Sequence, residues 1–106
     1  MPLASTAPHV ARELSLSGSD VAAALALFDE GNTLPFVARY RKERTGGLDE
    51  TQLRQVQERA KARAELEDRR EFVLGSIRDQ GALDPALEKR IRAVDTRQEL
   101  EDLYLP

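Results

Sequence analysis

The sequence predicts an all-α fold of five to six helices, with a helix-turn-helix-like front half and one long central helix. Apolar residues recur at helical spacings, and the alternating pattern of strands is absent. Charged residues make up 33% of the chain and aromatic residues only 5%, a balance typical of helical proteins with small interfaces. No proline interrupts the run between Asp49 and Pro85, which predicts the long helix.

The N-terminal part of the chain predicts two helices. Residues 1–6 follow no pattern and are expected to fray. Residues 8–14 predict a short helix, because Val10 and Leu14 are four positions apart and share a face. The second helix begins at a serine cap and continues to about residue 30, where Gly31 provides the left-handed residue that commonly ends a helix.

A third helix is predicted over residues 34–42. Thr33 caps it, and Pro35 falls in its first turn, where the missing N–H costs little. A helical wheel places Phe36, Val37 and Tyr40 on one face, which we expect to be buried. The expected core residues around this helix are Phe28, Phe36, Tyr40, Leu53 and Val56.

A double glycine and a capping box predict the start of the long helix. Gly46 and Gly47 allow backbone conformations that are closed to other residues. Asp49 and Gln52 have the spacing of a capping box, and Leu48 can form a hydrophobic staple with residue 53.

The apolar stripe of the long helix changes face along its length. Leu53, Val56, Ala60 and Ala64 lie on one side, whereas Leu66, Val73 and Ile77 lie about 120° away. We therefore expect the helix to pack against one group at its start and another at its end. The charged residues between these groups, 61–71, are expected to be solvated; the alternative is that they form a contact surface for another part of the parent protein.

Two shorter helices are predicted to follow. Gly81 ends the long helix, and Asp84 with Pro85 begins the next one by the cap-then-proline rule. Thr96 and Glu99 form a capping box for the last helix. The expected buried residues of these two helices are Leu87, Ile91, Val94, Leu100 and Leu103.

Two blocks of sequence carry a family resemblance. Residues 31–50 read GNTLPFVARYRKERTGGLDE, and residues 98–106 read QELEDLYLP after the long charged helix. With these blocks the chain resembles, from about Leu14 onward, the amino-terminal region of the Tex family of bacterial transcription accessory proteins.

The resemblance implies a large cytoplasmic nucleic-acid-binding protein whose first segment has a helix-turn-helix-like part. An RNase-H-like domain, a helix-hairpin-helix and a carboxy-terminal S1-type RNA-binding module are implied to follow. These modules are absent from the 106 residues. We therefore expect residues 1–106 to be the Tex-like amino-terminal helical domain, a piece of a larger protein.

Composition limits the class of function. The formal net charge is −3, which argues against a basic surface over the whole domain, so any nucleic-acid contact must come from a local patch. The absence of cysteine fits a reducing compartment. The first ten residues lack the pattern of a signal peptide, and no apolar run is long enough to cross a bilayer. We expect a cytoplasmic protein with no membrane partner.

No catalytic site, metal site or cofactor is expected. His9 is the only histidine and lies in the first helix, where we interpret it as structural. The double glycine could suggest a phosphate cradle. Asp49 and Glu50 occupy the place of the anion, which excludes this interpretation.

A basic patch is the candidate binding site. It carries a local charge of +3 within six residues, from Arg39, Arg41, Lys42 and Arg44 against Glu43. One hypothesis has this patch binding the phosphate backbone of RNA or DNA, weakly for this piece alone. Base reading and base stacking are not favoured, because no Asn or Gln lies on the helix and its aromatic residues are on the predicted apolar face.

The second hypothesis gives the patch a structural or interaction role. The same side chains would form ion pairs with the acidic residues 95–102, or with other domains of the parent protein. Transcription machinery is a further candidate partner. The helix-turn-helix spacing also has two interpretations. A plain packed helical hairpin is favoured over a groove-reading unit, because any two helices joined by a glycine turn have this pattern.

Overall fold

The computed structural model describes residues 1–104, which contain one short 3₁₀ helix, six α-helices and no strand. The all-α prediction and the long helix are confirmed. Leu105 and Pro106, which end the QELEDLYLP block, lie outside the described residues. The helices are η1 (Leu3–Thr6), α1 (Ala7–Leu14), α2 (Gly18–Asp29), α3 (Leu34–Tyr40), α4 (Glu50–Asp79), α5 (Pro85–Ala93) and α6 (Arg97–Tyr104).

The chain divides into two compact units, Met1–Ala64 and Glu65–Pro106, and α4 contributes to both. Each unit has its own apolar cluster. Leu53, Val56 and Ala60 on the first half of α4 belong to one cluster. Leu66, Val73 and Ile77 on the second half belong to the other. The predicted change of face along α4 is confirmed.

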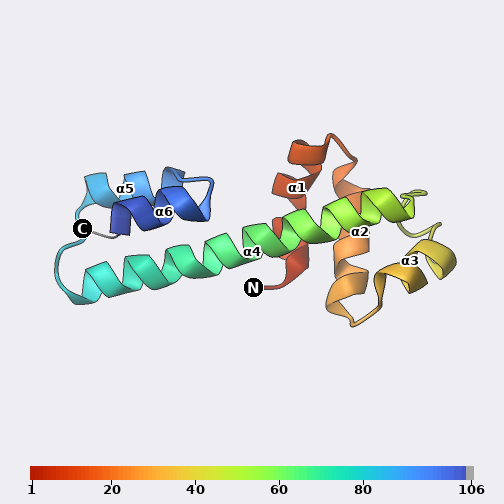
Figure 1. Cartoon of the computed structure of the whole chain (residues 1–106), viewed down its shortest axis with the longest axis horizontal. Helices are drawn as coiled ribbons and strands as arrows, with labels where there is room; N and C mark the ends of the chain where they lie inside the picture. Colours follow the sequence, from red (N-terminus) through yellow and green to blue (C-terminus); the bar gives the residue numbers. More distant parts are fainter. Residues whose placement is uncertain (105–106) are drawn as a thin grey trace. The chain divides into compact units, whose positions relative to one another are not determined.

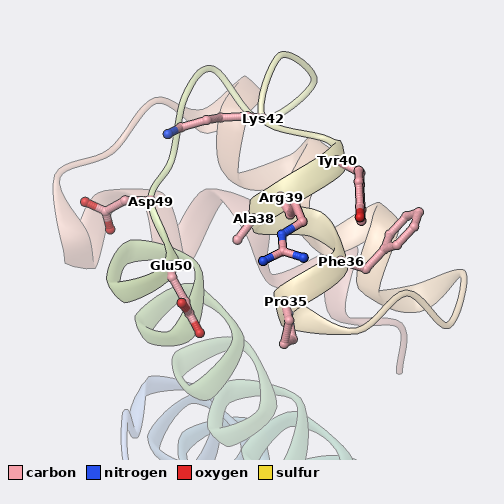
Figure 2. Close-up of a pocket in the computed structure, with 8 residues that line it drawn as sticks. All are labelled: Pro35, Phe36, Ala38, Arg39, Tyr40, Lys42, Asp49 and Glu50. Atoms are coloured by element: carbon pink, nitrogen blue, oxygen red, sulfur yellow. The ribbon is translucent and has the colours of Figure 1, made fainter.

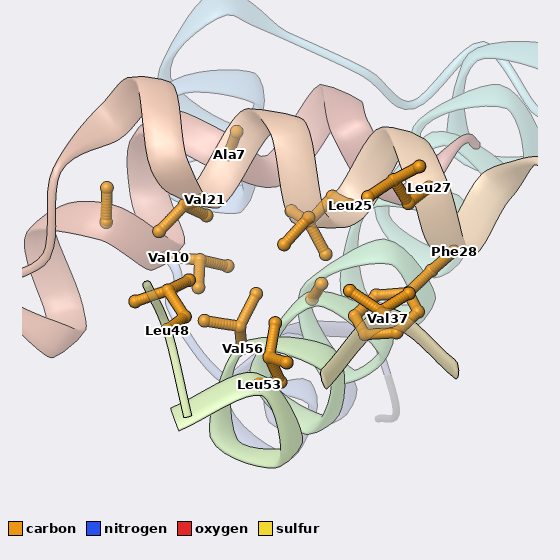
Figure 3. Packing of buried hydrophobic residues seen from close by; sticks show 13 residues of the cluster. Ala7, Val10, Val21, Leu25, Leu27, Phe28, Val37, Leu48, Leu53 and Val56 are labelled. Carbon is orange, nitrogen blue, oxygen red and sulfur yellow. The ribbon is translucent and has the colours of Figure 1, made fainter. Parts of the chain in front are cut away.

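The core of the first unit is built by α1, α2, α3 and the first turns of α4 (Figure 1). Ala24 of α2 is fully buried, and its small side chain lets a neighbouring helix approach closely. Figure 3 shows the larger side chains converging between the helices. The cluster includes three of the expected core residues, Phe28, Leu53 and Val56.

The expectation that residues 1–6 fray is wrong. Residues 3–6 form η1, and Thr6 is only 3% exposed. The carboxylate of Asp29 accepts hydrogen bonds from the backbone N–H groups of Leu3 and Ala4, each at 2.9 Å. This contact joins positions about 25 apart, so no local pattern of the sequence could reveal it.

The predicted orientation of α3 is also wrong. Tyr40 is 55% exposed, and Phe36 is only partly covered and lies outside the apolar cluster. Of the three residues on the predicted buried face, only Val37 is fully buried, and Leu34 and Ala38 pack beside it. In so short a helix, Val37 can share a face either with Phe36 and Tyr40 or with Leu34 and Ala38. The face with the smaller side chains, Leu34 and Ala38, lies against the core. The large rings therefore face outward.

The connection from α3 to α4 uses the predicted backbone devices. Gly46 and Gly47 have φ values of 66° and 87°, in the left-handed region that favours glycine. At the start of α4, the N–H of Gln52 donates to the Asp49 carboxylate at 2.8 Å, and the N–H of Asp49 donates to the Gln52 side chain at 3.0 Å. Both halves of the capping box are thus confirmed, and Leu48 beside it is 5% exposed.

In the second unit, α5 and α6 pack on the second half of α4 (Figure 1). The Asp84 carboxylate accepts from the N–H of Leu87 at 2.8 Å, and the Thr96 hydroxyl accepts from the N–H of Glu99 at 3.2 Å. The Asp84 cap is confirmed, and so is the half of the Thr96 capping box in which the Thr96 hydroxyl accepts. Ile91 and Leu100 are fully buried, in agreement with the predicted inner faces.

Candidate nucleic-acid interface

The predicted basic residues follow one another at the end of α3 and in the turn after it. Arg39 lies in the last turn of α3, Arg41 is its C-cap, and Lys42 and Arg44 lie in the turn. The turn is held by its own backbone, because Lys42 accepts a hydrogen bond from the N–H of Gly47 at 2.9 Å. Thr45 is fully buried and donates its hydroxyl to the same carbonyl at 3.2 Å.

Three of the four cations are available to a ligand. Arg39, Lys42 and Arg44 are exposed, and their side chains make no hydrogen bond or ion pair with the described residues of the first unit. Arg41 is different: its Nη1 donates to the carbonyl of Tyr40 at 3.0 Å. Its guanidinium also lies over the ring of Phe36, 5.0 Å from the centroid.

An open hollow of about 510 Å³ lies between α3 and the start of α4. Figure 2 shows Arg39 reaching into it and Lys42 crossing above it, while Phe36 and Tyr40 lie together on the opposite edge of α3. The residues that line it are Pro35, Phe36, Ala38, Arg39, Tyr40, Lys42, Asp49 and Glu50.

The two aromatic rings form an exposed pair. Their centroids are 5.3 Å apart, with the ring planes tilted by 48°, a favourable aromatic arrangement. The sequence pattern predicted that these rings are buried, and base stacking was not favoured for that reason. Because Tyr40 is exposed and Phe36 is only partly covered, that argument no longer holds.

Two acidic residues, Asp49 and Glu50, line the hollow at the start of α4, and each has a compensating neighbour. Asp49 accepts from the N–H of Gln52 at the N-terminus of α4, where the helix dipole favours negative charge. Glu50 accepts from Arg54 at 3.3 Å. The carboxylates therefore make the α4 side of the hollow less suited to an anion than the α3 side.

The second unit contains an arginine cluster that the sequence did not reveal. Arg70 lies in the segment expected to be solvated, yet it is 3% exposed, so that expectation is wrong here. Its guanidinium donates to the carbonyls of Ile91, Arg92 and Val94 at 2.9, 2.5 and 2.8 Å. These carbonyls lie at the C-terminal end of α5, where backbone C=O groups have no N–H donor within the helix. Arg70 is thus a cap built by another helix.

A neighbouring arginine binds the acidic end of the chain. Arg69 donates to Glu101 through Nε at 2.7 Å and through Nη2 at 3.2 Å. The hydrogen bond from Arg69, opposed by partial burial, lowers the pKa of the Glu101 carboxyl, and the same bond raises the pKa of Arg69. Within the second unit, Glu101 therefore already has a cationic partner.

Two further observations concern residues 1–104. None of the helices in this range combines the length and apolarity that a membrane span requires. Within the same range, no group of three or more metal-ligating side chains is close enough together to hold an ion.

Comparison with known proteins identifies the family. Residues 4–78 match the family model of the Tex-like protein N-terminal domain. Over 97 residues, or 92% of the chain, it is 53% identical to the transcriptional accessory protein Tex of Neisseria gonorrhoeae and 54% identical to protein YhgF of Escherichia coli strain K12. A more distant human relative, S1 RNA-binding domain-containing protein 1, is 32% identical over 82 residues, 77% of the chain.

The chain spans only a small part of these relatives: 13% of the N. gonorrhoeae protein, 12% of the E. coli protein and 8% of the human one. The family match and the high identity both cover most of the present sequence, including α3 and the turn after it. The chain therefore belongs to the Tex family and contains its N-terminal domain.

Proposed function

We propose that this chain is a non-enzymatic helical module of a cytoplasmic transcription accessory protein and that it contacts the phosphate backbone of nucleic acid. Arg39, Arg41, Lys42 and Arg44 form the contact. The observation that carries the proposal is that three of these cations are exposed on one surface without partners in the described first unit.

The names of the relatives support the setting of this proposal. One is named a transcriptional accessory protein, and another is named for an S1 RNA-binding domain. A module of such a protein would bind nucleic acid together with other domains, so a small basic patch is sufficient. With four or fewer phosphates neutralised, affinity should fall with salt with a shallow logarithmic slope of about −3 to −4 on a duplex.

Helices α2 and α3, with the turn between them, supply the helix-turn-helix-like part of this module. A recognition helix reads bases through polar side chains in the major groove. The sequence of α3, LPFVARY, offers no Asn or Gln for this purpose. Backbone contact therefore fits this surface better than sequence-specific reading of a duplex.

The test is binding of a fluorescently labelled oligouridine and a DNA duplex, measured by anisotropy at two salt concentrations. The variant Arg39→Ala/Lys42→Ala should weaken binding to both probes and make the salt slope shallower by about 2. The matched control is Arg12→Ala/Lys61→Ala, which removes one arginine and one lysine from exposed positions of α1 and α4. If the first variant binds as well as the control, the proposed contact is refuted.

The second candidate function is a purely structural or protein-interaction module. One observation favours it: Arg41 already makes two contacts within the chain, with the Tyr40 carbonyl and with the Phe36 ring. On this alternative, Arg39→Ala/Lys42→Ala leaves binding unchanged but lowers the melting temperature of the parent protein by several degrees. Binding affinity and melting temperature, measured on the same variant, therefore separate the two functions.

A further inference from the structure

We propose that Tyr40 and Phe36 form a base-stacking site, so that the α3 surface binds single-stranded nucleic acid in preference to a duplex. The inference rests on the proposed phosphate contact. It goes further in two ways: it states that the ligand is single-stranded, and it assigns a role to Tyr40 and Phe36, which make no phosphate contact.

The first argument is that the rings are not needed to hold α3 in place. Val37 is fully buried and anchors the helix, whereas Tyr40 is 55% exposed and Phe36 lies outside the apolar cluster. Among the described residues, Tyr40 is one of only three large apolar side chains with high exposure. Single exposed apolar residues are common, but two adjacent aromatic rings, tilted by 48° to each other, form a larger apolar surface on which a flat molecule can pack.

The second argument is that part of a stack is already assembled. The guanidinium of Arg41 lies 5.0 Å from the centroid of the Phe36 ring, and its hydrogen bond to the Tyr40 carbonyl fixes its position. Guanidinium planes and aromatic rings are the two groups on which proteins stack unpaired bases. The more exposed Tyr40 ring leaves room for a base to join this stack.

The third argument is the short distance along the chain between the rings and the free cations. Arg39 precedes Tyr40, and Lys42 follows it by two residues. Arg39 and Lys42 lie on the side of α3 toward the hollow, and the two rings lie on the opposite edge of the same helix (Figure 2). In a single strand, bases turn outward while the phosphates remain accessible, so one ligand can use both features. In a duplex the bases are stacked on each other, and stacking on Tyr40 would require unstacking them at a cost.

The carboxylates of the hollow determine where the strand runs. Asp49 and Glu50 lie at the start of α4 and disfavour phosphates there, even though each is partly compensated. The backbone of the strand should therefore follow Arg39 and Lys42 along α3, with its bases on the ring side.

The experiment compares Tyr40→Leu with the unmodified chain in anisotropy titrations against labelled oligouridine and a DNA duplex at low salt. Loss of one stacked base should reduce affinity for oligouridine by about 5- to 100-fold and leave duplex affinity unchanged. The control is Phe72→Leu. Phe72 is 58% exposed, and an arginine, Arg69, lies 4.9 Å from its ring centroid. Arg69 is bound to a carboxylate, that of Glu101, whereas Arg41 at the proposed site donates to a backbone carbonyl.

Tyrosine fluorescence gives an independent readout. The chain has two tyrosines and no tryptophan, so in Tyr104→Phe all of the emission comes from Tyr40. A base stacked on Tyr40 should quench this emission with the same midpoint as the anisotropy titration, after correction for absorption by the probe. Circular dichroism of every variant checks that the helices remain formed.

The outcomes distinguish this inference from the function on which it rests. If Arg39→Ala/Lys42→Ala weakens binding but Tyr40→Leu does not, the phosphate contact stands and the stacking site is refuted. Equal losses on oligouridine and duplex after Tyr40→Leu also refute it. If the unmodified chain binds neither probe at low salt, both proposals fail.

Discussion

Replacing Arg70 with methionine tests whether one buried guanidinium holds the second unit together. Arg70 is 3% exposed and donates to three carbonyls at the C-terminal end of α5. Methionine retains much of the length and apolar character of the side chain but has no donors. The carbonyls of Ile91 and Val94 would then be buried without their partner.

The expected loss can be estimated from general magnitudes. Removing one partner from a buried charged network costs about 3–5 kcal/mol, because the groups left behind lose both water and their hydrogen bonds. A folded unit of about forty residues has a total stability of about 2–6 kcal/mol. Arg70→Met should therefore unfold much of the second unit near room temperature.

The assay needs a signal that reports the second unit alone. In a Tyr40→Phe background the only tyrosine is Tyr104, which belongs to that unit and whose hydroxyl lies 3.0 Å from the Ser76 hydroxyl. Urea titrations followed by tyrosine fluorescence should shift to a much lower midpoint in Arg70→Met. The control is Arg78→Met, an exposed position on the same helix, where a change below about 0.5 kcal/mol is expected. Equal midpoints for the two variants would refute the capping role.

Three further perturbations test other parts of the structure. Val37→Ala should cost about 1–3 kcal/mol of stability and Phe36→Ala less than about 1 kcal/mol, because only the former empties a buried site; the reverse order in thermal unfolding would contradict the observed orientation of α3. Gly46→Ala should destabilise more than Gly47→Ala, because both positions have positive φ but only at Gly46 would a Cβ clash with the Asp20 carboxylate, which would have to move; equal melting temperatures would argue against this steric contact. The pKa of Glu101 is lowered in the folded state, so its contribution to stability is present above its unfolded pKa and is lost as pH falls through the lower folded value. Glu101→Gln should flatten this acid dependence of the Tyr104 unfolding midpoint, and an unchanged profile would show that the Arg69 contact does not matter.

Local rules predicted much of the fold. The capping box at Asp49, the Thr96 cap, the glycine ends of helices and the change of face along α4 each depend on residues within a few positions of one another. Helix propensity and capping act at this range, so the sequence contains the necessary information.

The failures occurred where the deciding contact is distant or the helix is short. The seven residues of α3 support two apolar faces around Val37, and the sequence pattern favoured the one with the larger rings. Arg70 was assigned to solvent because its partners, the α5 carbonyls, lie more than twenty positions away. The error at α3 also misplaced part of the candidate site: the cations were identified from the sequence, but the rings beside them were not.

The pair of hydrogen bonds between Asp29 and the N–H groups of Leu3 and Ala4 has a practical consequence for choosing where to begin the domain. A shortened version starting at α1 would retain every long helix and would look complete by secondary structure alone. It would nevertheless remove both donors from the Asp29 carboxylate and uncover the side of α2 against which η1 packs. A cloning boundary placed upstream of Leu3 preserves these two hydrogen bonds, whereas one placed at Ala7 removes them.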